Sequence, residues 1–295
     1  MHHQLNPLVC ILYLTNRCGG RCKHCTVRSD VRHLFNNGTD AVYDTVIKRI
    51  GECKELGVKF IELTGGDPLL WDRLPEVLAL CKKLGLFSIL SVSGPGIVSR
   101  LKDWGEKWIG LPSLLRFSVD GDRSYHDLNR GKGFYETIRV GLEAAKKVRP
   151  NGTTQLVFTL MPGKDGNINK NQFASVLQLA EESSAEVDVN PMFDTEFSGT
   201  KEKFGELWAN LSDQKKYCLN WLTRQKHIVK QSLAKVDFLL RGGNDLDQPT
   251  CHAAESVITI SASDRLMMPC YHSQFSIIPI GEKGLLAALE SKERL

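Results

Sequence analysis

Residues 9–25 read VCILYLTNRCGGRCKHC, an apolar run followed at once by three cysteines. The run at 9–15 has the length and apolar character of a buried strand. Cys18, Cys22 and Cys25 then lie on a loop that leaves the carboxyl end of this strand. Parallel α/β folds build their active sites at that end. Three thiols are an odd number for disulfides and one ligand short of a closed zinc site.

The composition is that of an ordinary globular protein. The chain has 295 residues, of which 42% are hydrophobic and 24% charged, and its net charge is +4. Basic residues form no clustered stripe, so no nucleic-acid partner is expected. No stretch approaches the about 20 apolar residues of a membrane span, and no signal peptide is recognisable. Nine cysteines without an export signal indicate a reducing compartment, so we expect a cytoplasmic protein.

Apolar segments alternate along the chain with segments of helical periodicity. The expected strands are Val9–Thr15, Lys59–Thr64, Phe87–Ser93, Leu115–Val119, Gln155–Leu160 and Glu186–Asn190. The expected helices are Asp40–Leu56, Asp72–Leu84, Phe134–Val148 and Gln172–Glu182, with Gly57 and Gly85 ending the first two. The strands read as continuously apolar, which is typical of strands covered on both faces. Six β–α units imply a parallel sheet and fall short of the eight of a full barrel. The predicted fold is an α/β partial (β/α)6 barrel over residues 1–195.

Residues 196–295 are expected to form a small C-terminal α/β-hairpin extension. Phe204–Lys230 has the spacing of one or two helices. Ser256–Ile260 and Leu266–Met268 are predicted to pair as a hairpin.

The spacing Cys18-x3-Cys22-x2-Cys25 favours an iron–sulfur cluster with one open iron. Thiolates suit both iron–sulfur clusters and zinc, and the two intervening glycines let the loop curl so that the sulfurs converge. A Cys3His zinc site that includes His24 is an alternative, although His24 is adjacent to Cys25 and the backbone disfavours both pointing at one ion. A local zinc knuckle or three incidental thiols are the remaining alternatives.

This cysteine spacing after a first strand resembles the signature of radical S-adenosylmethionine (radical SAM) enzymes, over about residues 8–195. The resemblance implies that Cys18, Cys22 and Cys25 hold a 4Fe–4S cluster, and that the amino and carboxylate groups of SAM chelate its fourth iron. It implies that the reduced cluster cleaves SAM to methionine and a 5′-deoxyadenosyl radical, which abstracts a substrate hydrogen atom. It further implies an electron donor such as flavodoxin or ferredoxin.

A second motif, Thr64-Gly65-Gly66-Asp67-Pro68, follows the second expected strand. It is similar to the family's Gly-Gly-Glu-Pro stretch, so the resemblance implies that Gly65, Gly66 and Asp67 bind the SAM amino group. Aspartate is one methylene shorter than glutamate, so the contact is either direct or made by a backbone carbonyl. A tight turn is the structural alternative.

A weaker motif ends the third expected strand. Ser91 and Ser93 stand where the family often has Thr-Asn-Gly, which implies contacts to the SAM ribose or carboxylate. Plain turn residues explain these serines equally well.

Another weaker motif lies at the fourth expected strand. Ser118 and Asp120, followed by His-Asp and by Arg130-Gly, resemble the family's strand-four stretch and share one strand face. Arg130 suits bidentate binding of the SAM carboxylate, with a solvated loop arginine as the alternative.

Asn190-Pro191, at the end of the sixth expected strand, is a poor match to a family stretch near adenine.

Cys251 and Cys270 flank the predicted C-terminal hairpin. They resemble the opening of the SPASM or twitch extensions of radical SAM enzymes, which hold auxiliary iron–sulfur clusters. No cysteine follows Cys270, so further ligands would come from elsewhere, and the candidates are Cys218, His252 and His272. An auxiliary cluster, a zinc site and no metal are the three alternatives. The other cysteines are expected to pack as small hydrophobes: Cys10, Cys53 and Cys81.

The leading functional prediction is a radical SAM enzyme that oxidises, epimerises or cross-links a peptide or a small metabolite. Because the chain starts directly at its first strand, a peptide substrate is expected to need a separate recognition protein or direct contacts with the barrel. A function of another class is a non-catalytic iron–sulfur or zinc protein that senses redox state or binds a partner. That alternative explains the cysteines but leaves the Gly-Gly-Asp-Pro motif at the next strand without a role.

Overall fold

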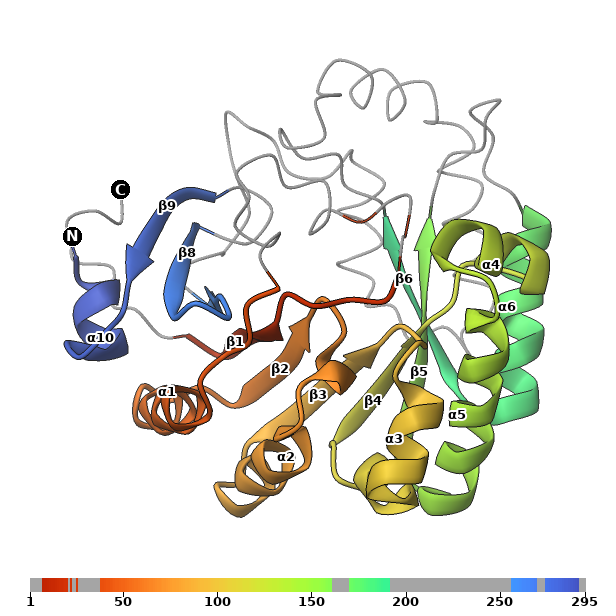
Figure 1. Ribbon diagram of the computed structural model, residues 1–295, viewed down its shortest axis with the longest axis horizontal. Coiled ribbons are helices and arrows are strands. Elements are labelled where there is room, and N and C mark those ends of the chain that lie inside the picture. The colour runs from red at the N-terminus through yellow and green to blue at the C-terminus, as the bar shows by residue number, and fades with distance from the viewer. Residues whose placement is uncertain are drawn as a thin grey trace.

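The computed structural model describes residues 7–20, 22, 25, 38–160, 170–191, 256–269 and 274–291. Its strands form one nine-stranded sheet in the order β6-β5-β4-β3-β2-β1-β7-β8-β9. Helices lie along one side of this sheet, with α1 and α10 near one end and α6 near the other (Figure 1). Within the described ranges, no helix is long and apolar enough to cross a membrane.

All six predicted barrel strands are present. They are β1 (Val9–Thr15), β2 (Phe60–Gly65), β3 (Phe87–Val92), β4 (Leu114–Ser118), β5 (Thr153–Leu160) and β6 (Glu186–Pro191). Each pairs in parallel with the next, so that Val9 lies opposite Phe60 and Phe60 opposite Phe87. The mostly parallel, open sheet confirms the predicted partial barrel.

The four predicted helices are also present, and the structure adds others. The predicted ones are α1 (Tyr43–Glu55), α2 (Leu74–Lys83), α5 (Phe134–Val148) and α6 (Lys170–Ser183). The unpredicted ones are the α-helices α3 (Ile97–Trp104) and α4 (Arg123–Arg130) and the 3-10 helices η1 (Pro68–Leu70) and η2 (Glu106–Gly110). Gly57 and Gly85 follow α1 and α2 with φ of 88° and 67°, a region that favours glycine, so both do end helices.

The main core lies between the strands and the helices. Cys10, Leu12 and Leu14 of β1 are at most 2% exposed and belong to one apolar cluster with the buried face of α1. Cys53 of α1 and Cys81 of α2 are buried in the same cluster, so the prediction that these thiols pack as hydrophobes is confirmed.

The expectation that the strands are covered on both faces is wrong for β2–β6. In these strands buried residues alternate with half-exposed ones. The half-exposed positions include Glu62, Arg116 and Asp188, on the face turned away from the helices. An open barrel leaves that face accessible, so polar side chains are tolerated there.

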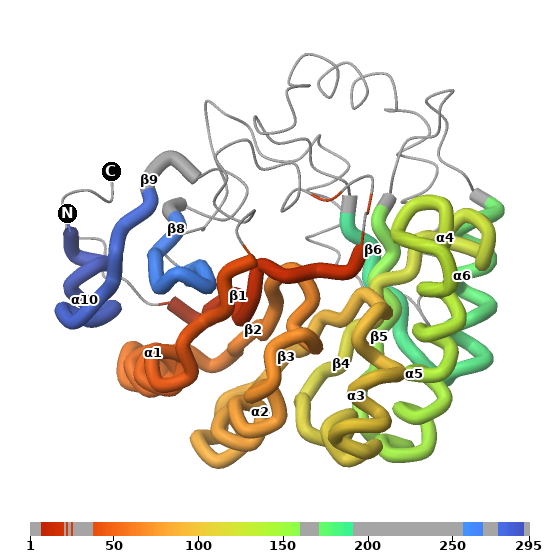
Figure 2. Tube along the Cα trace, viewed as in Figure 1, coloured from red at the N-terminus to blue at the C-terminus, as the bar shows by residue number. Residues whose placement is uncertain are grey.

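The C-terminal strands continue the barrel sheet. The predicted hairpin is confirmed as β7 (Val257–Ile260) and β8 (Arg265–Pro269), and β9 (Gln274–Pro279) and α10 (Gly284–Leu289) complete it. β7 also pairs in parallel with β1, which the sequence did not indicate. The trace in Figure 2 shows α10 beside α1.

The division of the chain at residues 195 and 196 stays a prediction. Several predicted features lie outside the described residues: the helical segment Phe204–Lys230, Cys218, Cys251, His252, Cys270, His272 and His24.

Candidate functional site

The cysteine loop leaves the carboxyl end of β1, as predicted. A Cβ atom placed on Gly20 would lie 3.4 Å from the Sγ atoms of both Cys18 and Cys22. The missing side chain therefore keeps the space between these two sulfurs open. The Gly20 amide donates to Cys18 Sγ at 3.3 Å, and the amide of Cys25 donates to the carbonyl of Cys22 at 3.2 Å. The sulfurs of Cys18 and Cys22 therefore lie on either side of the Gly20 position.

The thiols interact with one another but are not preassembled around one ion. Cys18 lies within electrostatic range of both Cys22 and Cys25. Across the described ranges, no three His, Cys, Asp or Glu side chains are close enough to hold a single metal ion. That Cys18, Cys22 and Cys25 hold one iron–sulfur cluster stays a prediction.

The second motif is joined directly to the cysteine loop by its backbone. The amide of Gly66 donates to the carbonyl of Thr15 at 2.7 Å, and the amide of Asp67 donates to that of Arg17 at 2.8 Å. A Cβ atom on Gly65 would lie 2.4 Å from the oxygen of Thr15, and one on Gly66 would lie 2.3 Å from that of Arg17. Only glycine permits this approach.

Comparison with known proteins decides the family. The family model described as Radical SAM superfamily matches residues 12–168, a stretch that holds both motifs. The chain belongs to the radical SAM superfamily. Members of this family use a 4Fe–4S cluster and SAM, and the chain is accordingly an enzyme of this family.

Individual relatives resemble only parts of the chain. Pre-heme d1 synthase from Dinoroseobacter shibae is 32% identical over 145 residues, which are 47% of this chain and 33% of the relative. GTP 3′,8-cyclase from Clostridium perfringens is 22% identical over 57% of this chain and 50% of its own length. The chain thus matches between a third and a half of the length of these relatives.

Among solved structures, Streptococcus suis SuiB bound to its precursor peptide SuiA is similar, with a TM-score of 0.70. The match covers 97% of this chain and 65% of SuiB at 14% identity, which is evidence for the fold alone.

Asp67, the departure from the radical SAM motif, is fully buried. Its Oδ1 accepts from the amide of Leu69 at 3.1 Å, and its Oδ2 accepts from the amide of Gly96 at 3.3 Å. Burial raises the pKa of Asp67 to about 6, although these two amides favour its ionised form. The carboxylate caps η1 and joins the β3–α3 loop to it. The predicted contact of Gly65, Gly66 and Asp67 with the SAM amino group stays a prediction.

Asp120 and Arg130 form a buried ion pair. Arg130 Nε donates to Asp120 Oδ2 at 2.7 Å, and its terminal nitrogen donates to Oδ1 at 2.8 Å. Burial raises the pKa of Cys22, and the positive charge of Arg130 opposes that effect. The guanidinium therefore lies near the cysteine loop and favours the thiolate there. Its predicted contact with the SAM carboxylate stays a prediction.

The three serines predicted to contact SAM, Ser91, Ser93 and Ser118, have different surroundings. Ser91 Oγ donates to Glu62 Oε1 at 3.1 Å, so it belongs to the inner face of the sheet. Ser93 Oγ is buried and has no hydrogen-bond partner in the described part of the chain. Such an orphaned hydroxyl fits an absent polar ligand. Ser118 occupies a half-exposed inner position at the end of β4.

Sequence reasoning missed other residues around the radical SAM loop. Phe134, at the start of α5, has its ring 3.5 Å from where a Gly20 Cβ would lie. Asn129 of α4 is 7% exposed, and its Nδ2 has no partner within the described ranges. Neither belongs to a motif, but Asn129 directly precedes Arg130, which the motif does include.

A polar layer crosses the inner face of the barrel. Arg116 Nε donates to Gln155 Oε1 at 3.2 Å, and Gln155 Nε2 donates to Glu186 Oε2 at 3.2 Å. The terminal nitrogens of Arg116 lie 3.6 Å from Glu62 and 3.9 Å from Asp188, beyond hydrogen-bond distance. Two carboxylates thus lie beside the Arg116 guanidinium and a third, that of Glu186, is joined to it through Gln155; together these are the charged residues of β1–β6.

Proposed function

We propose that this radical SAM enzyme abstracts a hydrogen atom from a peptide or another amide- or amine-bearing substrate. Cys18, Cys22 and Cys25 would hold the cluster, and the backbone of Gly65 and Gly66 would bind SAM. When bound, the reduced cluster supplies the electron that cleaves SAM to methionine and a 5′-deoxyadenosyl radical. The barrel orients the substrate and excludes water and stray hydrogen donors. An electron donor such as flavodoxin or ferredoxin belongs to the same proposal.

The charge of the inner face is the observation that supports a peptide or another amide- or amine-bearing substrate. Two carboxylates, those of Glu62 and Asp188, lie 3.6 Å and 3.9 Å from the guanidinium of Arg116, and Gln155 links this guanidinium to a third carboxylate, that of Glu186. On the described part of the inner face, this excess of negative charge disfavours a polyanion such as a nucleoside triphosphate. The same layer offers acceptors on the carboxylates and donors on Arg116, a combination that suits an amide or amine.

The comparisons are compatible with either substrate class. GTP 3′,8-cyclase is named for GTP, and SuiB binds the precursor peptide SuiA. The polar layer supports the peptide over the nucleotide for this chain. Whether the product is oxidised, epimerised or cross-linked remains part of the proposal, as does an auxiliary metal held by Cys218, Cys251 and Cys270.

Substrate-stimulated cleavage of SAM tests the proposal. The anaerobically reconstituted enzyme is given SAM and dithionite, with either a synthetic random octapeptide mixture or GTP, and 5′-deoxyadenosine is quantified by mass spectrometry. We expect peptides to increase the yield over the substrate-free level and GTP to leave it unchanged. Arg116→Met should reduce the peptide stimulation, while Arg123→Met, which removes a surface ion pair with Glu136, should not. Stimulation by GTP alone would overturn the peptide assignment.

A further inference from the structure

The two ends of the cysteine-bearing loop meet at the carboxyl end of β1. The amide of Asn16 donates to the carbonyl of Thr39 at 2.7 Å, and the amide of Ala41 donates to the carbonyl of Leu14 at 2.8 Å. Thr15 and Asp40 form an isolated antiparallel bridge between these two bonds. The chain therefore leaves and re-enters the fold at one point, and the cysteines lie between.

Arg17 and Asp40 join side chains across this point. Arg17 Nε donates to Asp40 Oδ1 at 2.9 Å, and a terminal nitrogen donates to Oδ2 at 2.7 Å. Thr15 Oγ1 also donates to Asp40 Oδ1 and accepts from the amide of Arg17 at 3.0 Å. A bidentate guanidinium–carboxylate pair fixes direction as well as distance. The residue that directly precedes Cys18 is thus held in place by the returning end of the loop.

Other contacts of Arg17 connect the same point to the SAM-binding motif. Its terminal nitrogen donates to the carbonyl of Leu70, and its own carbonyl accepts from the amide of Asp67 at 2.8 Å. Arg17 therefore touches the returning end of the loop and the segment that follows β2. Its position fixes the backbone from which Cys18 extends.

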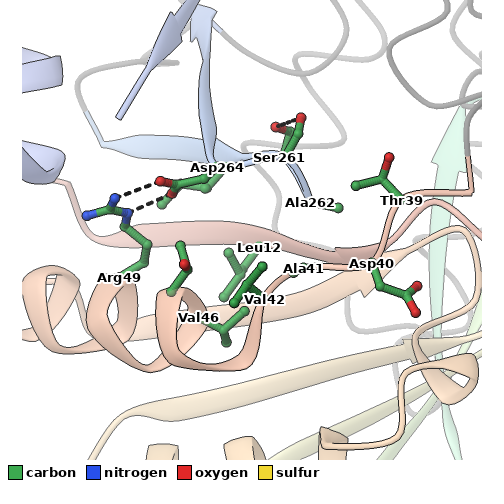
Figure 3. A pocket seen from close by; sticks show the side chains of 13 residues that line it. Leu12, Thr39, Asp40, Ala41, Val42, Val46, Arg49, Ser261, Ala262 and Asp264 are labelled. Carbon is green, nitrogen blue, oxygen red and sulfur yellow. Dashed lines mark hydrogen bonds and ion pairs between the residues drawn. The ribbon is translucent and has the colours of Figure 1, made fainter. Parts of the chain in front are cut away.

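The Asp40 carboxylate is separate from the ion pair that holds the C-terminal strands. A cavity of about 190 Å³ lies between the start of α1 and the β7–β8 turn, and Asp40 lines its edge. Figure 3 shows the carboxylate pointing away from Asp264 and Arg49 on the other side of that cavity. The Asp40 pairing therefore lies at the base of the cysteine loop, apart from the contacts of the C-terminal strands.

We propose that Arg17 and Asp40 form a clamp that positions Cys18 and so slows loss of the iron–sulfur cluster. The inference rests on the assignment of Cys18, Cys22 and Cys25 as the cluster ligands. Both side chains are more than 40% exposed, so the pair contributes little to global stability. Mutation of residues that orient metal ligands without binding the metal commonly lowers the metal affinity about 10–100-fold. The clamp should therefore affect cluster retention far more than folding.

Cluster release from purified protein tests the clamp. Wild type, Arg17→Met, Arg17→Lys, Asp40→Asn and the surface control Arg123→Met are reconstituted anaerobically with iron and sulfide. A ferrous chelator is added, and the absorbance of the cluster at about 400 nm is followed over time. Thermal unfolding of the metal-free proteins is measured in parallel. Electron paramagnetic resonance of the reduced samples, with and without SAM, reports the environment of the cluster.

We expect Arg17→Met and Asp40→Asn to lose the cluster about tenfold faster than wild type, with altered resonance spectra and nearly unchanged unfolding temperatures. Arg17→Lys keeps the charge but not the bidentate geometry, so its rate of cluster loss should lie between that of wild type and that of Arg17→Met. Wild-type release rates in folded Arg17→Met and Asp40→Asn would overturn the clamp. Wild type that takes up no cluster would instead overturn the ligand assignment.

Discussion

Arg49 of α1 binds both carboxylate oxygens of Asp264, a residue 215 positions later in the chain, at 2.7 Å each. The same guanidinium donates to Glu52 and to the carbonyl of Gly281. Arg49 is 2% exposed, so this is a buried network between the barrel and the C-terminal strands. The turn that holds Asp264 has φ of 59° at that residue, a left-handed conformation that aspartate tolerates. The extension is therefore fixed to the barrel by directional contacts as well as by strand pairing.

Arg49→Met should strongly destabilise the protein. It leaves Asp264 and Glu52 without their partner in a buried setting, which costs about 3–5 kcal/mol in comparable cases. Urea unfolding followed by circular dichroism measures the free energy of unfolding. Arg73→Met is the matched control, because Arg73 pairs with Glu76 on the surface of α2, and such pairs contribute less than about 1 kcal/mol. Equal effects of the two substitutions would show that the Arg49 network does not hold the extension.

Gly66→Ala should disrupt the cofactor site. The new Cβ atom would lie 2.3 Å from the carbonyl oxygen of Arg17 and 2.9 Å from that of Asn16, so it would clash with this backbone segment. We expect a loss of about 2 kcal/mol or more in unfolding free energy and reduced iron content after reconstitution.

Gly51→Ala, inside α1, provides the control for Gly66→Ala because nothing lies within 4 Å of its new Cβ. Alanine is the better helix former, so this variant should gain up to about 1 kcal/mol and bind iron normally. Normal iron content in Gly66→Ala would contradict the close approach of the two loops.

Asp67 should make stability depend on pH. Burial raises its pKa in the folded protein from the ordinary 3.8 to about 6. A raised pKa means that the folded state holds this proton more tightly than the unfolded state. The contribution of protonated Asp67 to the free energy of unfolding is therefore complete below pH 3.8 and is lost as pH rises through about 6. This contribution is on the order of 3 kcal/mol.

Asp67→Asn removes this titration. Between pH 4.5 and 7.5, in steps of about 0.5 pH units, its unfolding temperature should depend less on pH than that of wild type. Identical pH profiles for wild type and Asp67→Asn would show that Asp67 does not titrate in this range.

The cysteines should divide into two classes by reactivity. Cys10 and Cys81 are fully buried; a hydrogen bond to Cys53 and burial raise the pKa of Cys10, and burial raises the pKa of Cys81 to about 12. Burial also raises the pKa of Cys18, to about 11, but Cys18 is exposed and Cys25 half-buried, so the expected difference in labelling rests on access to the reagent. Brief N-ethylmaleimide treatment of the metal-free protein, read by peptide mass spectrometry, should label Cys18 and Cys25 and spare Cys10 and Cys81. Labelling of Cys10 at the rate of Cys18 would contradict the described core.

The motifs were predictable because their information is local. Cys18, Cys22 and Cys25 lie within eight positions, and the Gly-Gly pair at 65–66 follows a recognisable strand. The helix α4 was missed because its sequence, RSYHDLNR, is almost entirely polar. It begins because Asp122 accepts from the amide of Tyr125, and local periodicity does not reveal such a cap.

Pairings between segments that are far apart in the chain could not be predicted from the sequence. Nothing near Val9 indicates that Val257 lies beside it in the sheet. From the sequence, the shorter side chain of Asp67 leaves open whether the contact with SAM is direct or made by a backbone carbonyl. The structure instead gives its carboxylate two backbone donors, which only the folded β3–α3 loop supplies. The polar inner face is not predicted because the continuously apolar reading of the strands implies that both of their faces are covered.

Formation of 5′-deoxyadenosine shows whether this protein cleaves SAM at a cluster held by the three cysteines. Wild type and Cys25→Ala are reconstituted anaerobically with iron and sulfide, given SAM, dithionite and the peptide mixture, and assayed by mass spectrometry alongside a SAM-binding measurement. We predict product from wild type and none from Cys25→Ala. A wild-type protein that carries the cluster yet neither binds SAM nor forms 5′-deoxyadenosine would contradict it.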